Sequence, residues 1–324
     1  MDRPGSGSSA LYKMSNSLSR LDAFLLCLLT LIWGINWPIM KIGVADFPAF
    51  AFRTITMAGG LVVFALIARF QGHTLRIAPR YWREVALLGT TNMALWYALS
   101  IIGIKMLASG RAAILGYTLP VWVAVIGLLV YRERQGPRLL LALVASAVGV
   151  GLLLSNELRA MAGSPLGTLC MLVAAATWGL GTHQLRRRKQ PTPLVVLSFW
   201  MMAGTLVFCG LLSLLFERDQ WVRPPNAAEW ASIVFNIVLA YGVAQLLWFR
   251  LASTLPPVVS ALSVMMIPVV GVLSGLLLLG ERPGWTDLAA LAAILVAIAA
   301  TLLPGRKDPP AIRQQPGIAP PARR

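Results

Sequence analysis

Aromatic and amide side chains recur at helical spacing inside the apolar segments of this chain. Asn92 and Trp96 are four residues apart, so they would share one face of a helix, with Tyr97 directly beside them. Indole, phenol and amide groups can hold an organic solute that is partly apolar and needs a few directed hydrogen bonds. The candidate substrate-binding residues are Trp33, Asn36, Trp37, Asn92, Trp96, Tyr97, Tyr117, Trp178, Asn236, Tyr241 and Gln245.

A structural role is the alternative for these residues. Polar side chains in an apolar bundle can simply form hydrogen bonds between neighbouring helices, and tryptophan can form an interfacial belt. Trp33 lies too deep in its apolar segment for such a belt. We favour a cavity because aromatic side chains recur in both halves of the chain, with Trp96 and Tyr241 separated by 145 residues.

Pro120 and Pro268 lie inside apolar segments. A proline in a helix interior removes a backbone hydrogen bond and bends the helix. Both are therefore candidate hinges, and a static kink accommodated by neighbouring helices is the alternative. Tyr117 lies about one helical turn before Pro120 and would move with such a bend.

The amino-acid composition indicates that these apolar segments lie in lipid. Of the 324 residues, 57% are hydrophobic and only 12% are charged, whereas a soluble globular protein carries about 25% charged residues. The net charge of +16 is distributed in short basic clusters between apolar segments and forms no nucleic-acid recognition motif. The sequence therefore predicts an all-α integral membrane protein that binds no nucleic acid.

The apolar segments are long enough to cross a bilayer, which takes about 20 residues of helix. Ten candidates begin near Leu21, Phe47, Val85, Ala108, Leu139, Leu166, Pro193, Ala228, Pro256 and Thr286. With both termini in the cytoplasm, 20 of the 28 Lys and Arg residues lie on the cytoplasmic side, seven on the outer side and one within a span. The positive-inside rule therefore selects this orientation.

The two halves of the chain resemble each other. Trp33-Gly34 recurs 145 residues later as Trp178-Gly179, and Glu133 with the residues after it recurs 148 residues later at Glu281. Five spans in each half make the repeats inverted, which is an architecture of secondary transporters. We expect a cytoplasmic tail at 1–20, repeats at 21–155 and 156–304, and a disordered cytoplasmic tail at 305–324.

At these motifs the chain resembles the EamA-type transporters of the drug/metabolite transporter superfamily. The resemblance lies in Trp33-Gly34 with Lys41, Pro48 with Arg53, Pro120, and Glu133 with Gly136. It implies a ten-helix carrier of inverted repeats in the bacterial inner membrane, with a cavity between the halves. Such carriers often export amino acids, other metabolites or toxic compounds. The second half departs from the pattern, since Ser198 and Arg186 occupy the positions of Arg53 and Lys41.

Ionisable residues are scarce inside the spans. We expect Arg53 to snorkel to the outer surface, with a carboxylate substrate or Asp46 as alternative partners. Glu133 and Glu281 fall at helix ends on opposite sides and are expected to be caps or latch partners. No Asp or Glu lies in mid-span, and His183 is expected to be a packed or interfacial histidine. We therefore expect facilitated transport or exchange instead of carboxylate-driven proton antiport.

We expect the protein to transport small organic metabolites such as amino acids. The alternatives are multidrug efflux, a membrane sensor, or an intramembrane enzyme. The enzyme is disfavoured because the chain has no H-E-x-x-H or G-x-S-x-G motif and only two histidines. We expect no cofactor or metal, and a solute and membrane lipid as partners. The sequence does not choose between monomer and homodimer.

Overall fold

The computed structural model describes residues 19–133, 138–159, 164–254 and 257–302. The expected tails, 1–20 and 305–324, lie outside this range apart from Ser19 and Arg20. Within the described range the chain forms helices and no strands. The elements are α1 (Arg20–Gly43), α2 (Ala49–Phe70), η1 (Pro79–Tyr81), α3 (Trp82–Leu88), η2 (Gly89–Ala94), α4 (Leu95–Met106), α5 (Ser109–Gly116), α6 (Leu119–Leu129), α7 (Arg138–Arg159), α8 (Pro165–Arg186), α9 (Leu194–Phe216), η3 (Arg218–Gln220), α10 (Ala227–Phe235), η4 (Asn236–Val243), α11 (Ala244–Thr254), α12 (Pro257–Leu279) and α13 (Trp285–Leu302).

Among the described residues, eight helical segments are long and apolar enough to cross a membrane. They are Arg20–Gly43, Ala49–Phe70, Pro79–Met106, Ser109–Leu129, Arg138–Ser155, Pro165–Arg186, Leu194–Phe216 and Ala227–Trp248. The last two expected spans correspond to shorter apolar helices, Met265–Leu279 and Trp285–Thr301. Large apolar side chains such as Val62, Leu211 and Leu277 are exposed on the outside of the bundle, as lipid contact requires. The protein is thus an all-helical integral membrane protein.

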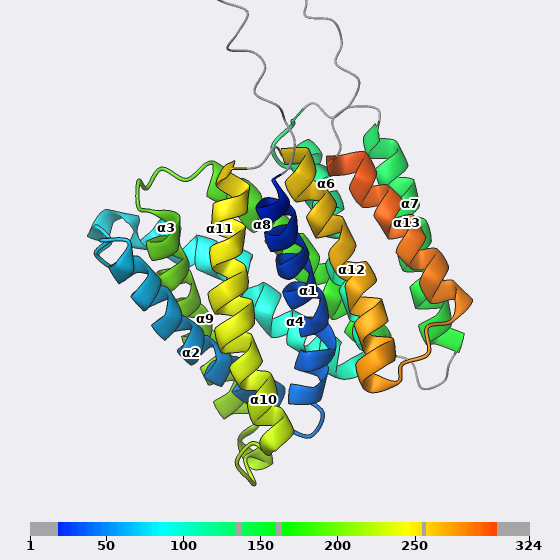
Figure 1. The fold of residues 1–324 in the computed structure, drawn as a ribbon, viewed down its shortest axis with the longest axis horizontal. Coiled ribbons are helices and arrows are strands. Elements are labelled where there is room, and N and C mark those ends of the chain that lie inside the picture. The colour runs from blue at the N-terminus through cyan, green and yellow to red at the C-terminus, as the bar shows by residue number, and fades with distance from the viewer. Residues whose placement is uncertain (1–18, 134–137, 160–163, 255–256, 303–324) are drawn as a thin grey trace, which may run out of the picture.

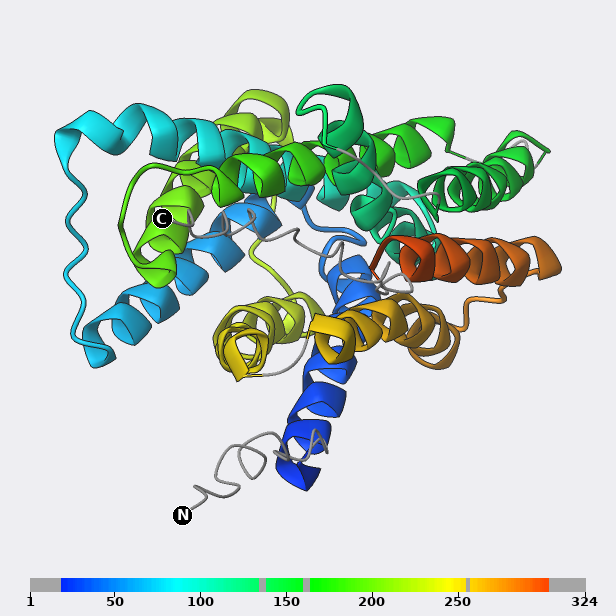
Figure 2. The ribbon, with the colours of Figure 1, turned by 90° about the horizontal axis from the view of Figure 1, so that it is seen from above.

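The long helices form one bundle (Figure 1). α1 lies between α11 and α12 and packs closely against α12, while α8 packs against α4 and α6. α7 and α13 pack together at one side, and α2 and α9 pack together at the other, a separation that is also visible from above (Figure 2). α1 begins and α13 ends at the same end of the bundle.

Two glycines of the repeated Trp-Gly motif bring helices into close contact. A Cβ atom at Gly34 would overlap the side chain of Val270, and one at Gly179 would lie 3.1 Å from the carbonyl carbon of Trp122. Trp122 and Val270 are 148 residues apart, so the two contacts occur at related places in the halves. In each case a small residue lets the backbone of a neighbouring helix approach, as is typical of membrane bundles.

Three spans differ from regular α-helix in ways that the apolar pattern does not reveal. The third and eighth spans each contain a π-helical turn, η2 and η4. The fourth span is interrupted at Tyr117 and Thr118, and Pro120 lies in the first turn of α6, where a missing N–H costs little. Pro268, in contrast, lies inside the continuous helix α12. A hinge role for either proline stays a prediction.

Candidate functional site

Aromatic pairs connect the two halves of the bundle. Trp96 on α4 meets Trp178 on α8 with ring centroids 5.3 Å apart, and Tyr97 meets Tyr241 of η4 at 6.1 Å. The tyrosine pair is nearly perpendicular, with an interplanar angle of 83°, and the tryptophan rings meet edge to face at 62°, an arrangement that aromatic quadrupoles favour. Each pair takes one ring from each half, so a movement of one half relative to the other would change both contacts.

The other predicted aromatic residues lie in separate contacts. Trp37 packs edge-on against Tyr117, with centroids 6.2 Å apart. Trp33 packs against Trp248 at 5.8 Å, and its Nε1 donates to the carbonyl oxygen of Ala240 at 3.5 Å. The structure therefore groups six of the seven predicted aromatic residues in three packing clusters: Trp37, Trp96 and Tyr117 in one, Tyr97 and Tyr241 in another, and Trp33 in a third.

Of the predicted amides, Asn92 and Asn236 are buried, and Asn36 and Gln245 are half-buried. Two of the four have a polar atom without a partner. Asn236 is fully buried, and its Nδ2 donates to the carbonyl oxygen of Ser232 at 3.0 Å. Within the described part of the chain, the Oδ1 atoms of Asn236 and Asn36 are buried and accept no hydrogen bond. An unsatisfied buried acceptor costs about 1–3 kcal/mol, so a hydrogen-bond donor from a bound solute would be favourable at either position.

Asn92 and Asn236 share an unusual backbone setting. Asn92 lies in η2 and Asn236 begins η4, the two π-helical turns. Such turns are rare and frequently mark functional sites because they alter the direction of side chains within a helix. Gln245, the last predicted amide, is half-buried in the first turn of α11.

The expectation that Arg53 snorkels to the surface is wrong. Its side chain is only 2% exposed. Its guanidinium donates to the hydroxyl of Tyr241 at 3.3 Å and to that of Ser100 at 3.4 Å, and lies 5.0 Å from the ring centroid of Tyr97. Two hydroxyls and an aromatic ring from other helices surround the guanidinium inside the bundle. The sequence around Arg53 does not show that these groups lie close to it.

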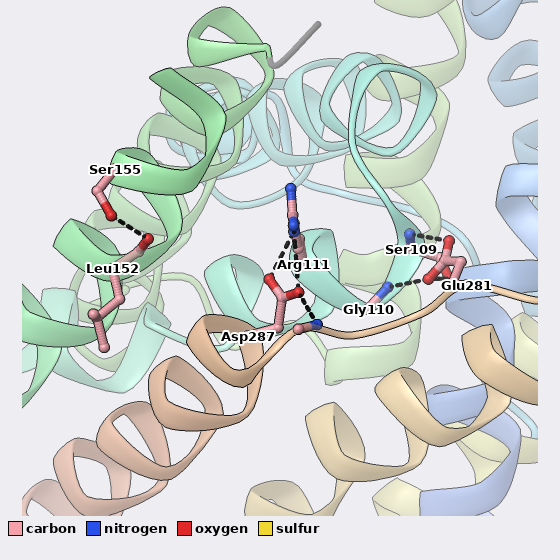
Figure 3. A network of polar contacts seen from close by, with 8 residues as sticks. Ser109, Gly110, Arg111, Leu152, Ser155, Glu281 and Asp287 are labelled. Atoms are coloured by element: carbon pink, nitrogen blue, oxygen red, sulfur yellow. Dashed lines mark hydrogen bonds and ion pairs between the residues drawn. The ribbon is translucent and has the colours of Figure 1, made fainter. Parts of the chain in front are cut away.

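A glutamate joins the halves at the end of the bundle where α5 begins (Figure 3). The carboxylate of Glu281 accepts hydrogen bonds from the backbone N–H groups of Ser109 at 2.6 Å and Gly110 at 3.1 Å, and from the Ser109 hydroxyl at 3.0 Å. We call these contacts the Glu281 clasp. A carboxylate at a helix N-terminus satisfies free N–H groups and complements the helix dipole. The predicted capping role of Glu281 is confirmed.

Further polar contacts reinforce this end of the bundle. Arg111 of α5 forms a bidentate ion pair with Asp287 of α13, with Nε 2.7 Å from Oδ1 and Nη2 3.3 Å from Oδ2 (Figure 3). The Nζ atom of Lys41 donates to the backbone carbonyl oxygens of Lys105 and Leu107, at 2.7 and 2.8 Å. These contacts hold the ends of α1, α4, α5 and α13 together.

Glu217 is a second capping carboxylate, and the sequence reasoning missed it. Its oxygens accept from the backbone N–H groups of Phe50 at 2.9 Å and Ala51 at 3.0 Å, at the start of α2. The hydroxyl of Ser213 also donates to it at 2.9 Å. Its position directly after the apolar helix α9 was the available signal, but the choice of α2 as its partner depends on the packing of the two helices.

The opposite end of the bundle has a different arrangement. Glu133 accepts a hydrogen bond from Arg187 at 2.9 Å, and this contact lowers the pKa of the Glu133 carboxyl group. His183 is buried, stacks on Tyr131 with centroids 4.8 Å apart, and its Nε2 lies 2.8 Å from the carbonyl oxygen of Val123. It is the packed histidine that was expected.

A cavity of ≈ 460 Å³ opens beside the Glu281 clasp. Its lining residues are Lys41, Ile42, Ala45, Asp46, Asn226, Ala228, Glu229, Leu279 and Glu281. None of the predicted substrate-binding residues lines it, so the central cavity stays a prediction. The described residues hold no cluster of three or more His, Cys, Asp or Glu side chains suited to a metal.

Comparison with known proteins identifies the family. Residues 21–155 and 165–303 each match the EamA-like transporter family. The "Uncharacterized transporter YoaV" of Bacillus subtilis is 26% identical over 254 residues, which cover 78% of this chain and 87% of the relative. The "Probable amino-acid metabolite efflux pump" of Salmonella typhimurium is 26% identical, with coverage of 87% and 94%. The "Uncharacterized inner membrane transporter YedA" of Escherichia coli K12 is 23% identical, with coverage of 83% and 87%.

The fold is also similar to that of a solved crystal structure. The TM-score is 0.61 at 20% sequence identity, and the alignment covers 88% of this chain and 98% of the other. At this level of identity the likeness concerns the fold alone. The double match along the sequence, together with the apolar helices of the bundle, shows that this chain belongs to the EamA-like transporter family.

Proposed function

We propose that the protein exports small organic metabolites such as amino acids across the bacterial inner membrane, by alternating access between two inverted five-helix halves. The observation that carries this proposal is the contact of Trp96 with Trp178 and of Tyr97 with Tyr241, because each pair joins the halves. The efflux pump of Salmonella typhimurium named above supports amino acids as the solute class.

The proposal includes ten spans. The two shorter apolar helices, Met265–Leu279 and Trp285–Thr301, would complete the second half. The contacts of Gly34 with Val270 and of Gly179 with Trp122 support this duplication, because offsets of 145 and 148 residues relate them. The excess of Lys and Arg on one side supports cytoplasmic termini.

Alternating access requires contacts that form at one end when they break at the other. The Glu281 clasp holds the start of α5 at one end. The repeat relates residues that are 148 positions apart. It makes Glu133, at the other end, the counterpart of Glu281, and it makes Pro257, at the start of α12, the counterpart of Ser109. Glu133 is instead paired with Arg187. We propose that opening the clasp accompanies transfer of Glu133 to the backbone N–H groups that follow Pro257 in the first turn of α12, since proline itself has no N–H to donate.

Counterflow tests the proposal directly. In this assay, liposomes that contain the purified protein are preloaded with unlabelled solute, and the uptake of labelled solute is measured. The panel contains amino acids and cationic drugs. Wild-type protein is expected to take up at least one amino acid, and a Trp96→Ala/Tyr241→Ala double variant is expected to lose about tenfold or more of this uptake, since each side chain buries large apolar area. Trp285→Ala is the control, because Trp285 is 74% exposed.

The outcomes separate the alternatives. Uptake restricted to cationic drugs would favour multidrug efflux. No uptake of any solute would remove the support for a carrier. Gel filtration and circular dichroism show whether the double variant is folded. If it is unfolded, the variants Trp96→Phe and Tyr241→Phe are measured in its place, because phenylalanine preserves ring packing.

The scarcity of acidic residues in the spans leads to a prediction about coupling. No Asp or Glu lies in the middle of a span, so the chain lacks a carboxylate that could carry protons through the bilayer centre. We expect the transport rate in proteoliposomes, measured at a fixed solute gradient with an imposed proton gradient, to stay unchanged when a protonophore collapses the proton gradient. A rate that falls to background on collapse would overturn the prediction.

A further inference from the structure

We infer that Arg53 binds the carboxylate of the transported solute, so that the substrates are organic monocarboxylates, amino acids included. The inference rests on the proposed transport function and names the group that the site recognises. It concerns a place in the fold formed by α2, α4 and η4, where Arg53 meets Ser100, Tyr97 and Tyr241.

The guanidinium has weak and incomplete partners in the structure. Its two hydrogen bonds, to Tyr241 and Ser100, are 3.3 and 3.4 Å long and involve neutral hydroxyls. Its Nε atom is buried and has no hydrogen-bond partner among the described residues. The side chain is 98% shielded, since only 2% of its surface is exposed.

A buried guanidinium requires a negative partner more than neutral ones. Arg stays protonated in proteins, so it cannot relieve burial by losing its charge. An unpaired charge in a low-dielectric interior costs several kcal/mol. No described carboxylate forms an ion pair with Arg53. Glu217, which caps the start of the same helix, already accepts from Phe50, Ala51 and Ser213.

A solute carboxylate fits this place chemically. A guanidinium binds a carboxylate through two parallel hydrogen bonds, and these charge-assisted bonds are about twice as strong as neutral ones. The unpartnered Nε supplies a further donor. The hydroxyl of Tyr241 can donate to the same carboxylate, and so can that of Ser100 if it turns from the carbonyl oxygen of Tyr97, 3.4 Å away. The rings of Tyr97 and Tyr241 can then contact the remainder of the solute.

The site is asymmetric between the halves. The residue 145 positions after Arg53 is Ser198, which is buried and uncharged. A single positive charge on one side of the bundle would orient each solute with its carboxylate toward the start of α2. The same charge would disfavour solutes that carry a net positive charge and no carboxylate, such as cationic drugs, which distinguishes this site from one for lipophilic cations.

The test measures discrimination between acids and their amides. The probes are L-phenylalanine, L-leucine and L-threonine, each compared with its carboxamide, by thermal stabilisation of the detergent-solubilised full chain and by counterflow in liposomes. Wild-type protein is expected to prefer at least one acid over its amide by about 10- to 100-fold. Arg53→Gln is expected to abolish this preference, and Arg53→Lys to retain part of it.

A change in discrimination is not produced by a general loss of folded protein, because acid and amide are compared in the same sample. Arg69→Gln is the matched control, since it removes an exposed positive charge from the same helix and should leave the preference unchanged. If Arg53→Gln does not fold, Ser100→Ala with Arg53→Lys provides the second measurement and should lower the preference stepwise.

The two proposals fail separately. Acid-selective stabilisation without counterflow would contradict transport and support the site at Arg53. Counterflow with equal preference for acid and amide would support transport and overturn the site. Wild-type protein that binds none of the acids, or an Arg53→Gln variant that keeps the wild-type preference, would also overturn it.

Discussion

Replacing Glu281 by alanine is expected to lower the thermal stability of the protein by removing the acceptor that caps the start of α5. The Glu281 clasp includes two backbone N–H groups at the start of α5 and the hydroxyl of Ser109. Ser109 is fully buried, so alanine at position 281 would leave its N–H group without an acceptor. Hydrogen bonds to a charged group contribute about 1.5–3 kcal/mol, and we expect a loss of about 3 kcal/mol in the free energy of unfolding.

The measurement is thermal unfolding of the purified protein in detergent. Glu281→Gln should fall between wild type and Glu281→Ala, because an amide oxygen can still accept but carries no charge. Glu133→Ala is the matched control: Glu133 is the repeat counterpart, and its side chain is 37% exposed in a surface ion pair with Arg187, an arrangement that contributes little. Equal losses of thermal stability in Glu281→Ala and Glu133→Ala would contradict our inference that the Glu281 clasp stabilises the protein more than the Glu133–Arg187 ion pair does.

Replacing Gly181 by alanine is expected to destabilise the contact between α8 and η2. A Cβ atom at position 181 would lie 2.7 Å from the Cα atom and 2.8 Å from the backbone nitrogen of Asn92. These atoms belong to the backbone, so no side-chain rotation can relieve the overlap and a helix must move. Forced overpacking of this kind costs about 1–3 kcal/mol. We expect a lower unfolding midpoint in detergent and, because Asn92 would be displaced, reduced counterflow.

Gly204→Ala is the control for this substitution. Gly204 lies inside the α-helix α9, and a Cβ atom there would meet nothing within 4 Å. Alanine is favoured over glycine in a helix interior by about 1 kcal/mol, so this variant should keep or slightly raise the unfolding midpoint. A Gly181→Ala variant as stable as Gly204→Ala would show that α8 and η2 do not pack as closely as the structure has them.

The positions of the spans followed from the sequence because the free energy of transfer into lipid depends mainly on local composition. Leu21 and Phe47 were expected to begin the first two spans, and the helices begin at Arg20 and Ala49. The seventh span was expected to begin near Pro193, and α9 begins one residue later, at Leu194.

The sequence indicated which types of residue form the candidate site, but it did not indicate how these residues are arranged in space. Predicted aromatic residues do meet across the halves, as Trp96 and Trp178 do. Their division into three packing clusters was not visible, because helical spacing defines a face and leaves the partner of that face open. The π-helical turns that carry Asn92 and Asn236 were also hidden, since they produce no change in the apolar pattern.

Arg53 illustrates the limit best. Its sequence position near the start of α2 allowed both an exposed and a buried side chain, because a long arginine can reach in either direction. Tyr241 and Ser100, its partners, are 188 and 47 residues away, and Ser109 is 172 residues from Glu281. Local composition and the order of motifs thus determined the membrane character, the family resemblance and the spans. Only tertiary packing decided which charges are buried and which helix ends are capped, because these contacts join residues that are brought together by other parts of the chain.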